Sequence, residues 1–300
     1  ITIYQLAITM GILISYIVNY GLHDVENNWR WMFATGLIPS VVFFTGLIFI
    51  PESPRWLMKR GLKEKAVSVL KRINGIGDVE EEAREIELSI SDADGKTNIL
   101  TLFKPVYRKV IILGFLLAVF VQISGINTVI DYAPKILMAA GLEIKNALLQ
   151  TSLIGIVNFT FTFIALWLID KVGRKMLYIV GSAGMAIALI MMAIAFHFEL
   201  APGFTTIFIM LFIAFFASCI GPAFWTLVAE MFPNQIRGTA VAMISFTQWV
   251  FNFLVVLLFP HLLEAIGGSM TFLFLAFMSA LQLLIASSIS RKPKGKLWKR

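Results

Sequence analysis

Side chains suited to binding a small molecule by non-covalent contacts stand inside stretches of the sequence that are otherwise apolar. The amides of glutamine and asparagine each donate and accept hydrogen bonds. Tryptophan offers a flat apolar face and one N–H donor. The residues of this kind are Gln5, Gln122, Asn127, Asn158, Trp225, Gln248 and Trp249. Together they predict a site that bonds to hydroxyl groups and packs against C–H groups of a ligand.

The spacing of these residues indicates where the chain must deform. Gln122 and Asn127 are five residues apart in the run VQISGINTVIDYAP, so a regular helix would separate them by about 140°. Gly125 and the serine before it allow a bend that would let both amides reach one cavity. The competing interpretation of each amide is a hydrogen bond to a neighbouring helix, worth about 0.6 kcal/mol. Asn252, four residues after Gln248, is interpreted as structural.

Catalysis finds no support in the sequence. His23, His197 and His261 lie near the ends of apolar runs, and no serine, histidine and aspartate set or metal-ligand cluster accompanies them. The single cysteine, Cys219, lies within an apolar run, so no disulfide framework exists. We therefore expect a protein that is not an enzyme and that has no cofactor, no metal and no catalytic residue.

Membrane-spanning helices must position the polar side chains. The chain is 58% hydrophobic, against roughly 45–50% apolar residues in soluble domains. Runs without charge recur at 1–22, 31–50, 110–130, 146–169, 176–196, 200–229, 238–260 and 265–290. Each reaches about 20 residues, enough to cross a hydrocarbon core of about 30 Å. The sequence predicts an all-α integral membrane protein with eight transmembrane helices.

The distribution of positive charge predicts the orientation. If residues 51–109 face the cytoplasm, 22 of the 25 Lys and Arg residues lie inside and only Arg30, Lys135 and Lys145 lie outside. This asymmetry is the positive-inside pattern of membrane proteins. The net charge of +7 is thus explained by orientation and requires no nucleic acid partner. We expect a multi-pass protein of the plasma (inner) membrane, with the linker 51–106 and the C-terminal tail in the cytoplasm.

The pattern of spans also predicts the domain organisation. Residues 1–50 hold two helices of an N-terminal bundle, 51–106 form a cytoplasmic helical linker, 107–290 form a six-helix C-terminal bundle, and 291–300 are a basic tail. The first residue already lies inside an apolar run. We therefore expect these helices to correspond to spans 5–12 of a 6+6 bundle whose first four helices are absent from the chain.

Acidic and basic residues recur together at three cytoplasmic ends of spans. They lie in PESPRWL (51–57), DKVGRK (170–175) and AEMFPNQIRG (229–238). The predicted network consists of Glu52, Arg55, Asp170, Arg174, Glu230 and Arg237. Such charges can pair in one conformation and separate in another, although exposed pairs are individually weak. The alternative is that they are ordinary charges at helix ends.

These motifs, with QISGIN (122–127) and GPAFW (221–225), resemble the sugar porter family of the major facilitator superfamily in order and spacing over essentially the whole chain. Within that family the sequence is most similar to the bacterial D-xylose–proton symporter and to glucose transporters. The resemblance implies a monosaccharide transporter, for a pentose, hexose or polyol, that works by alternating access and by sugar–proton symport. It further implies a monomer in the lipid bilayer whose partners are the sugar and the co-transported proton.

The resemblance assigns roles to individual residues. The sugar would contact Gln5, Gln122, Asn127, Asn158, Trp225, Gln248 and Trp249, and Asp131 and Tyr132 would form the outer gate. Three departures from the family pattern stand out. Val121 replaces a glutamine, Asp131 replaces the first tyrosine of the gate, and the tail has RKPKGK where relatives carry an acidic string.

Asp131 has two interpretations. An acid at membrane depth usually marks a function, whereas a residue near the aqueous outer mouth would pair with Lys135 four positions on; we favour the pair. Two other functions stay open for the chain, namely a facilitative uniporter and a membrane sugar sensor that binds without transport. The short tail argues against the sensor.

Overall fold

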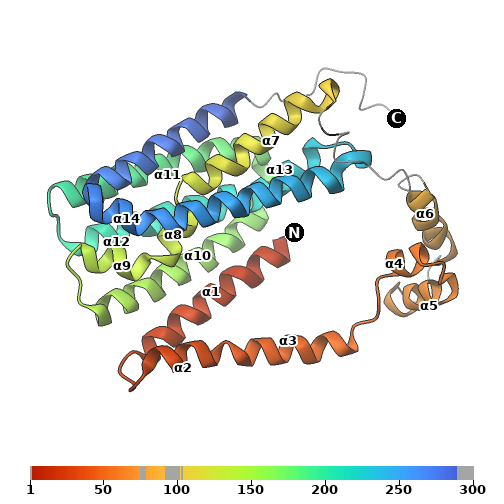
Figure 1. Ribbon diagram of the computed structural model, residues 1–300, viewed down its shortest axis with the longest axis horizontal. Coiled ribbons are helices and arrows are strands. Elements are labelled where there is room, and N and C mark those ends of the chain that lie inside the picture. Colours follow the sequence, from red (N-terminus) through yellow and green to blue (C-terminus); the bar gives the residue numbers. More distant parts are fainter. Residues whose placement is uncertain (1, 75–78, 92–101, 103, 289–300) are drawn as a thin grey trace. The chain divides into compact units, whose positions relative to one another are not determined.

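The computed structural model describes residues 2–74, 79–91, 102 and 104–288 (Figure 1). All regular secondary structure in this part of the chain is helical. The chain forms two compact units, residues 1–28 with 102–300 and residues 29–101. This grouping cuts the chain at other places than the predicted domain boundaries, which remain predictions. The basic tail 291–300 lies outside the described residues.

The unit made by residues 1–28 and 102–300 is a helical bundle. Its elements are α1 (Thr2–Leu22), α7 (Pro105–Ile123), α8 (Ile126–Asp131), α9 (Ala133–Ala139), α10 (Ile144–Val172), α11 (Arg174–His197), α12 (Pro202–Phe215), the π-helical turn η2 (Phe216–Ile220), α13 (Gly221–Met231) and α14 (Asn234–Ser288). α1 packs on α10, α7 packs on α14, and α11 packs on both α12 and α14. All of the predicted binding residues therefore lie within this one unit.

The second unit, residues 29–101, includes most of the predicted linker. α2 (Asn28–Thr35) begins at its boundary, and α3 (Leu37–Phe49), α4 (Pro54–Lys59), α5 (Lys63–Asn74) and α6 (Val79–Ser91) follow. Pro54 stands in the first turn of α4, where its missing N–H costs nothing. Leu70, Val79 and Ala83 form a small core between the linker helices, and Lys63 Nζ lies 2.6 Å from Glu87 Oε2.

Seven helical stretches of the described residues are long and apolar enough to cross a membrane. The last of them, Ile236–Ser288, contains both of the final predicted runs. These runs are joined in α14, but the backbone at Gly267 is not helical (φ 75°, ψ 167°) and the chain reverses there (Figure 1). Glycine tolerates this positive φ. The residues 268–288, here called the last segment of α14, thus form a separate helix that packs beside α11.

Two interruptions shape the interior of the bundle. Gly125 has φ +85° and separates α7 from α8, as the sequence predicted for this region. The π-helical turn η2 comes directly before Gly221 and Pro222. A π-helical turn inserts one extra residue into the helix, so α13 is rotated relative to a continuous helix. Gly221 and Pro222 indicate a bend at this point of the sequence, because proline lacks an N–H, but they do not predict its π-helical form.

Small residues let the helices approach closely. A Cβ atom added to Gly181 of α11 would lie 2.7 Å from both Cys219 Cβ and Ile220 Cγ1 of η2. A Cβ atom added to Gly155 of α10 would lie 2.8 Å from Tyr16 Cδ2 of α1. Close packing at small residues drives association of helices in lipid, because the hydrophobic effect does not act between helices there. These glycines therefore fix how the helices that carry the polar residues meet.

Candidate functional site

Three amide side chains meet at the break between α7 and α8. Asn127 Nδ2 donates to Gln122 Oε1 at 2.9 Å and to Asn252 Oδ1 at 2.7 Å. Gln122 is buried, whereas Asn127 and Asn252 are half-buried. We call these three residues the amide cluster. It joins the two halves of the broken helix to α14.

The break itself brings Gln122 and Asn127 together. The N–H of Gly125 donates to the Gln122 carbonyl at 2.9 Å, and Ser124 Oγ donates to the Val121 carbonyl at 2.7 Å. These bonds partner backbone groups that would otherwise be costly at membrane depth. With α7 ended in this way, the five-residue separation no longer places the two amides on different faces of one helix.

The amide cluster leaves polar atoms available for a ligand. Both hydrogens of Asn127 Nδ2 are used within the cluster. Asn127 Oδ1 remains as an acceptor, and Gln122 Nε2 and Asn252 Nδ2 remain as donors without a protein partner among the described residues. A set that mixes donors and acceptors suits hydroxyl groups, because each hydroxyl also donates and accepts.

The other predicted binding residues lie on α1, α10, α13 and α14. Gln248 is buried and its Oε1 has no hydrogen-bond partner in the described part of the chain. Asn158 is 3% exposed. Trp225 is half-buried and packs edge-on against Phe224, with ring centroids 5.1 Å apart. None of the contacts found in the described residues joins these three to the amide cluster.

Gln5 and Trp249 mark two further positions. Gln5 Nε2 lies 3.6 Å from the place that a Cβ atom on Gly221 would occupy, so α1 brings this amide to the start of α13. Glycine at this position leaves room for the amide. Trp249 lies on the surface of the unit, with 63% of the residue exposed.

The residues predicted to form the outer gate stand at the junction of α8 and α9. Asp131 ends α8 and is exposed, and Tyr132 packs on Phe259 with ring centroids 5.7 Å apart. The expected pair between Asp131 and Lys135 was wrong, because Lys135 Nζ instead lies 3.3 Å from Glu264 Oε1. The reason is the backbone at Tyr132 (φ −105°, ψ 15°), which distorts the helix between the two residues, while Glu264 offers Lys135 another partner.

α1 contacts this junction through a hydrogen bond to the main chain. Tyr16 Oη donates to the Ile130 carbonyl at 2.7 Å. In a continuous helix that carbonyl would accept from the N–H of residue 134, but this residue is Pro134 and has none. Ser152 Oγ of α10 donates to the Tyr16 carbonyl at 3.2 Å. Tyr16 therefore ties α1 to both α8 and α10.

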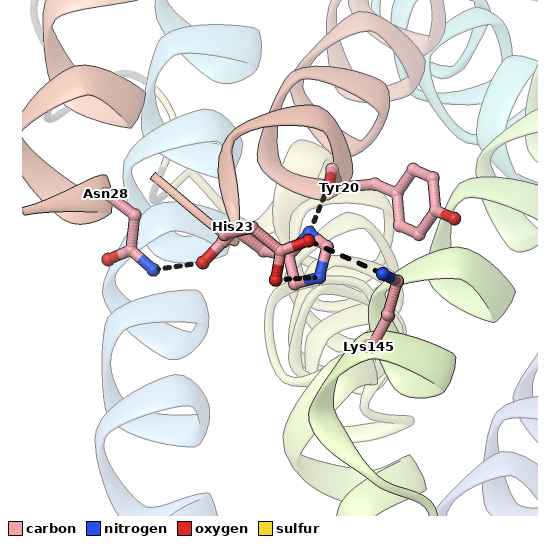
Figure 2. Close-up of polar contacts among 5 residues, drawn as sticks. Tyr20, His23, Asn28 and Lys145 are labelled. Carbon is pink, nitrogen blue, oxygen red and sulfur yellow. Dashed lines mark hydrogen bonds and ion pairs between the residues drawn. The ribbon is translucent and has the colours of Figure 1, made fainter. Parts of the chain in front are cut away.

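A polar group after α1 makes a second connection to α10 (Figure 2). His23 Nδ1 lies 2.7 Å from the Tyr20 carbonyl oxygen, and His23 Nε2 lies 2.9 Å from Asp24 Oδ1. The other oxygen of Asp24, Oδ2, lies 3.4 Å from Lys145 Nζ at the start of α10. Asn28 Nδ2 donates to the His23 carbonyl at 2.8 Å. The turn that follows α1 is thus held against α10 by exposed polar contacts.

Part of the predicted charge network is assembled. Arg174 Nε at the start of α11 lies 3.4 Å from Glu230 Oε1 near the end of α13. Arg237 Nε donates to the Phe232 carbonyl at 3.2 Å, which steadies the turn between α13 and α14. Glu52 and Arg55 belong to the linker unit and are exposed. The side chain of Asp170 lies outside the described residues, although its backbone belongs to α10.

Two residues of this region were not assigned to it from the sequence. Asn252 was interpreted as structural, yet it completes the amide cluster. Its spacing of four residues from Gln248 was the available signal, because it places both amides on one helix face. Tyr16 carried no comparable signal, since its partner is a main-chain carbonyl.

Sequence comparisons relate the chain to known transport proteins. The model of the family described as "Sugar (and other) transporter" matches residues 1–290. The arabinose-proton symporter of Bacillus subtilis (strain 168) is 37% identical over 303 aligned residues, which cover 98% of this chain and 65% of that protein. The D-xylose-proton symporter of Escherichia coli (strain K12) is 41% identical over 264 residues, which cover 85% of this chain and 53% of that protein.

A solved structure shares the fold. The partially occluded inward open conformation of the xylose transporter XylE from E. coli matches with a TM-score of 0.85 at 33% identity, over 98% of this chain and 64% of that chain. The chain thus spans between about half and two thirds of the length of these relatives. With a family model that covers nearly all of its residues, the chain belongs to the sugar (and other) transporter family.

Proposed function

We propose that this chain serves in the transport of a monosaccharide by alternating access, with the sugar coupled to a proton. The observation that carries the proposal is the amide cluster at a broken helix, because transporters place their substrates at discontinuous helices near the membrane midplane. The names of the relatives support it, since two of them are sugar–proton symporters. A pentose, hexose or polyol is the proposed substrate class.

The proposed binding mode follows from the atoms left available. Gln122, Asn127 and Asn252 exchange donors and acceptors with sugar hydroxyls that lose their water on binding. Gln5, Asn158 and Gln248 add further amides, and Trp225 and Trp249 pack on the C–H face of the ring. The residues of this chain bind and release the sugar, and none breaks a bond.

The proposed gates lie at the two ends of the bundle. On the outer side, Asp131 and Tyr132 close over the site, and the bond from Tyr16 holds the same junction. On the cytoplasmic side, Arg174 and Glu230 pair in this conformation and separate when that side opens. Glu52, Arg55, Asp170 and Arg237 complete the network in the proposal. Alternation then consists of exchanging one set of contacts for the other.

The proposed setting is the plasma (inner) membrane. The protein crosses the bilayer several times as a monomer, with the linker 51–106 and the tail 291–300 in the cytoplasm. The support is the excess of Lys and Arg in the segments assigned to that side, since cytoplasmic loops carry such an excess. Labelling of cysteines introduced in the linker, with reagents that do not cross the membrane, tests the orientation.

Uptake by the full product of the gene in liposomes tests the function. Radiolabelled arabinose, xylose, glucose and inositol would be offered with and without an inward proton gradient. Saturable uptake that the gradient stimulates supports the proposal. Saturable uptake indifferent to the gradient would show a uniporter, and binding without uptake would show a sensor. A protein that neither binds nor carries any of the four sugars would overturn the proposal.

An aspartate variant separates the coupling from the transport. Asp131→Asn keeps the size of the side chain and removes its charge. If Asp131 takes part in coupling, the variant should lose the stimulation by the gradient and keep uptake down a sugar gradient. If the proton gradient stimulates uptake by the variant as strongly as uptake by the wild type, Asp131 belongs to the outer gate alone.

A further inference from the structure

We propose that Leu275 is a positioning residue for the sugar site, because it holds the break in the helix between Gln122 and Asn127. The inference rests on the proposed function, since it concerns the same amide cluster. Leu275 is not proposed to contact the sugar. It acts on the backbone that carries two of the amides, from the last segment of α14.

Leu275 fills the space directly beside the Cα atom of Gly125. A Cβ atom on Gly125 would lie 2.8 Å from Leu275 Cδ1 and 3.2 Å from Cδ2. Side-chain carbons do not approach each other to 2.8 Å, so the leucine occupies the space that any other residue at position 125 would need. Leu275 is only 2% exposed. Its isopropyl group therefore rests directly on the glycine backbone.

A shift of this backbone would alter the amide cluster. Gln122 stands three residues before Gly125 and Asn127 stands two after it, and the two side chains are joined by a bond of 2.9 Å. Hydrogen bonds weaken steeply when their distance or angle departs from the preferred range. If the break moved toward a space left by a smaller residue at 275, the donors and acceptors of the cluster would lose their mutual placement.

The last segment of α14 is itself held by a polar face. Leu275, Ser279 and Gln282 lie on one side of the helix at spacings of four and three residues, and all three are buried. Gln282 lies beside Tyr178 of α11, which is also fully buried. A rotation of the segment would expose this buried face and separate Gln282 from Tyr178. The packing of this face thus favours the rotation that presents Leu275 to Gly125.

Aromatic packing fixes the other end of the same segment. Phe272 of α14 packs on Phe196 of α11 with ring centroids 5.2 Å apart, and on Phe259 with centroids 6.4 Å apart. Leu275 lies one turn further along. It is therefore placed between an aromatic contact and a polar contact with α11, so its position is determined by α11 as well as by its own helix.

The experiment compares Leu275→Ala with Leu273→Ala, a matched control on the same helix. Leu273 is 42% exposed, so the same truncation there leaves the interior unchanged. Uptake by the full product of the gene in liposomes would be measured per inserted protein for xylose and glucose. We expect KM of Leu275→Ala to rise about tenfold, as expected for a misplacement below 1 Å, with a changed ratio between the two sugars. The control variant Leu273→Ala should keep the KM of the wild type and the same ratio between the two sugars.

A merely structural role would give a different result. If Leu275 only stabilised the fold, truncation would lower the amount of inserted protein and leave KM and the ratio between sugars unchanged, which would overturn the inference. Leu275→Met, which has a similar volume and a flexible side chain that can still fill the space beside Gly125, should keep KM close to that of the wild type.

If the alanine variant does not insert, Leu275→Ile decides the question. It keeps the volume but moves a methyl group from Cγ to Cβ, away from Gly125. A raised KM supports the inference and an unchanged KM overturns it. Failure of the wild type to carry either sugar, or the other two sugars tested above, would refute the proposed function itself. Uptake by the wild type with unchanged KM in the variants would refute only the role of Leu275.

Discussion

Substitution of Asn252 by leucine should weaken sugar binding through Asn127. Asn252 Oδ1 accepts from Asn127 Nδ2 at 2.7 Å, and leucine of similar size removes the acceptor without leaving a large space. A hydrogen bond between membrane helices contributes about 0.6 kcal/mol on average, and a typical one in proteins about 0.5–1.5 kcal/mol. If this energy orients Asn127 for the sugar, KM should rise by roughly 3- to 10-fold, since about 1.4 kcal/mol is a factor of ten.

A double-mutant cycle tests whether the two residues act together. Initial uptake rates at a series of sugar concentrations would be measured for Asn252→Leu, Asn127→Ala and the double variant. Residues in direct contact are non-additive by about 0.5 kcal/mol or more, so the double variant should be little worse than Asn127→Ala alone. Phe253→Leu, at an exposed neighbouring position, controls for a change on α14. Additive losses would refute the reasoning that Asn252 works through Asn127.

Two further predictions concern the packing of α1 and α11. Tyr16→Phe removes only the hydroxyl that bonds to the Ile130 carbonyl, so it should favour opening of the outer side by about 0.5–1.5 kcal/mol. Accessibility of a cysteine introduced near the outer gate would report the shift, and unchanged labelling would contradict it. Gly181→Ala forces a Cβ atom to within 2.7 Å of Cys219 Cβ and should lower stability by about 1–3 kcal/mol. Gly203→Ala, where nothing lies within 4 Å, should leave the thermal midpoint in detergent within error of the wild type.

The sequence predicted the features that depend on local chemistry. Gly125 follows a serine in an apolar run, and a bend there was expected because both residues weaken a helix. The structure shows the break at that glycine. The final two runs, 238–260 and 265–290, appear as two helical parts, although these parts meet at the non-helical backbone of Gly267, a few residues later than predicted. The length and composition of the apolar runs were sufficient to predict these helices, because the bilayer sets the length of a spanning helix.

Features that depend on contacts between distant segments could not be predicted. Asn252 belongs to the amide cluster because α14 packs beside α7. Its spacing from Gln248 places both amides on one helix face, but it does not identify Asn127 as the partner. The pair of Asp131 with Lys135 was expected on the assumption of one helix, whereas the break at Tyr132 gives Lys135 a different partner. The π-helical form of the turn before Gly221 could not be predicted either, since Gly221 and Pro222 indicate only that the helix can bend there.

The bond from Tyr16 to Ile130 has a consequence for how the protein tolerates mutation. Its acceptor is a main-chain oxygen, which every amino acid supplies. Substitutions at position 130 therefore leave the acceptor in place, whereas every natural substitution at position 16 removes the phenolic donor. Changes at position 130 can thus accumulate without removing the link to α1, whereas a change of Tyr16, or of the proline that leaves the carbonyl free, would weaken it.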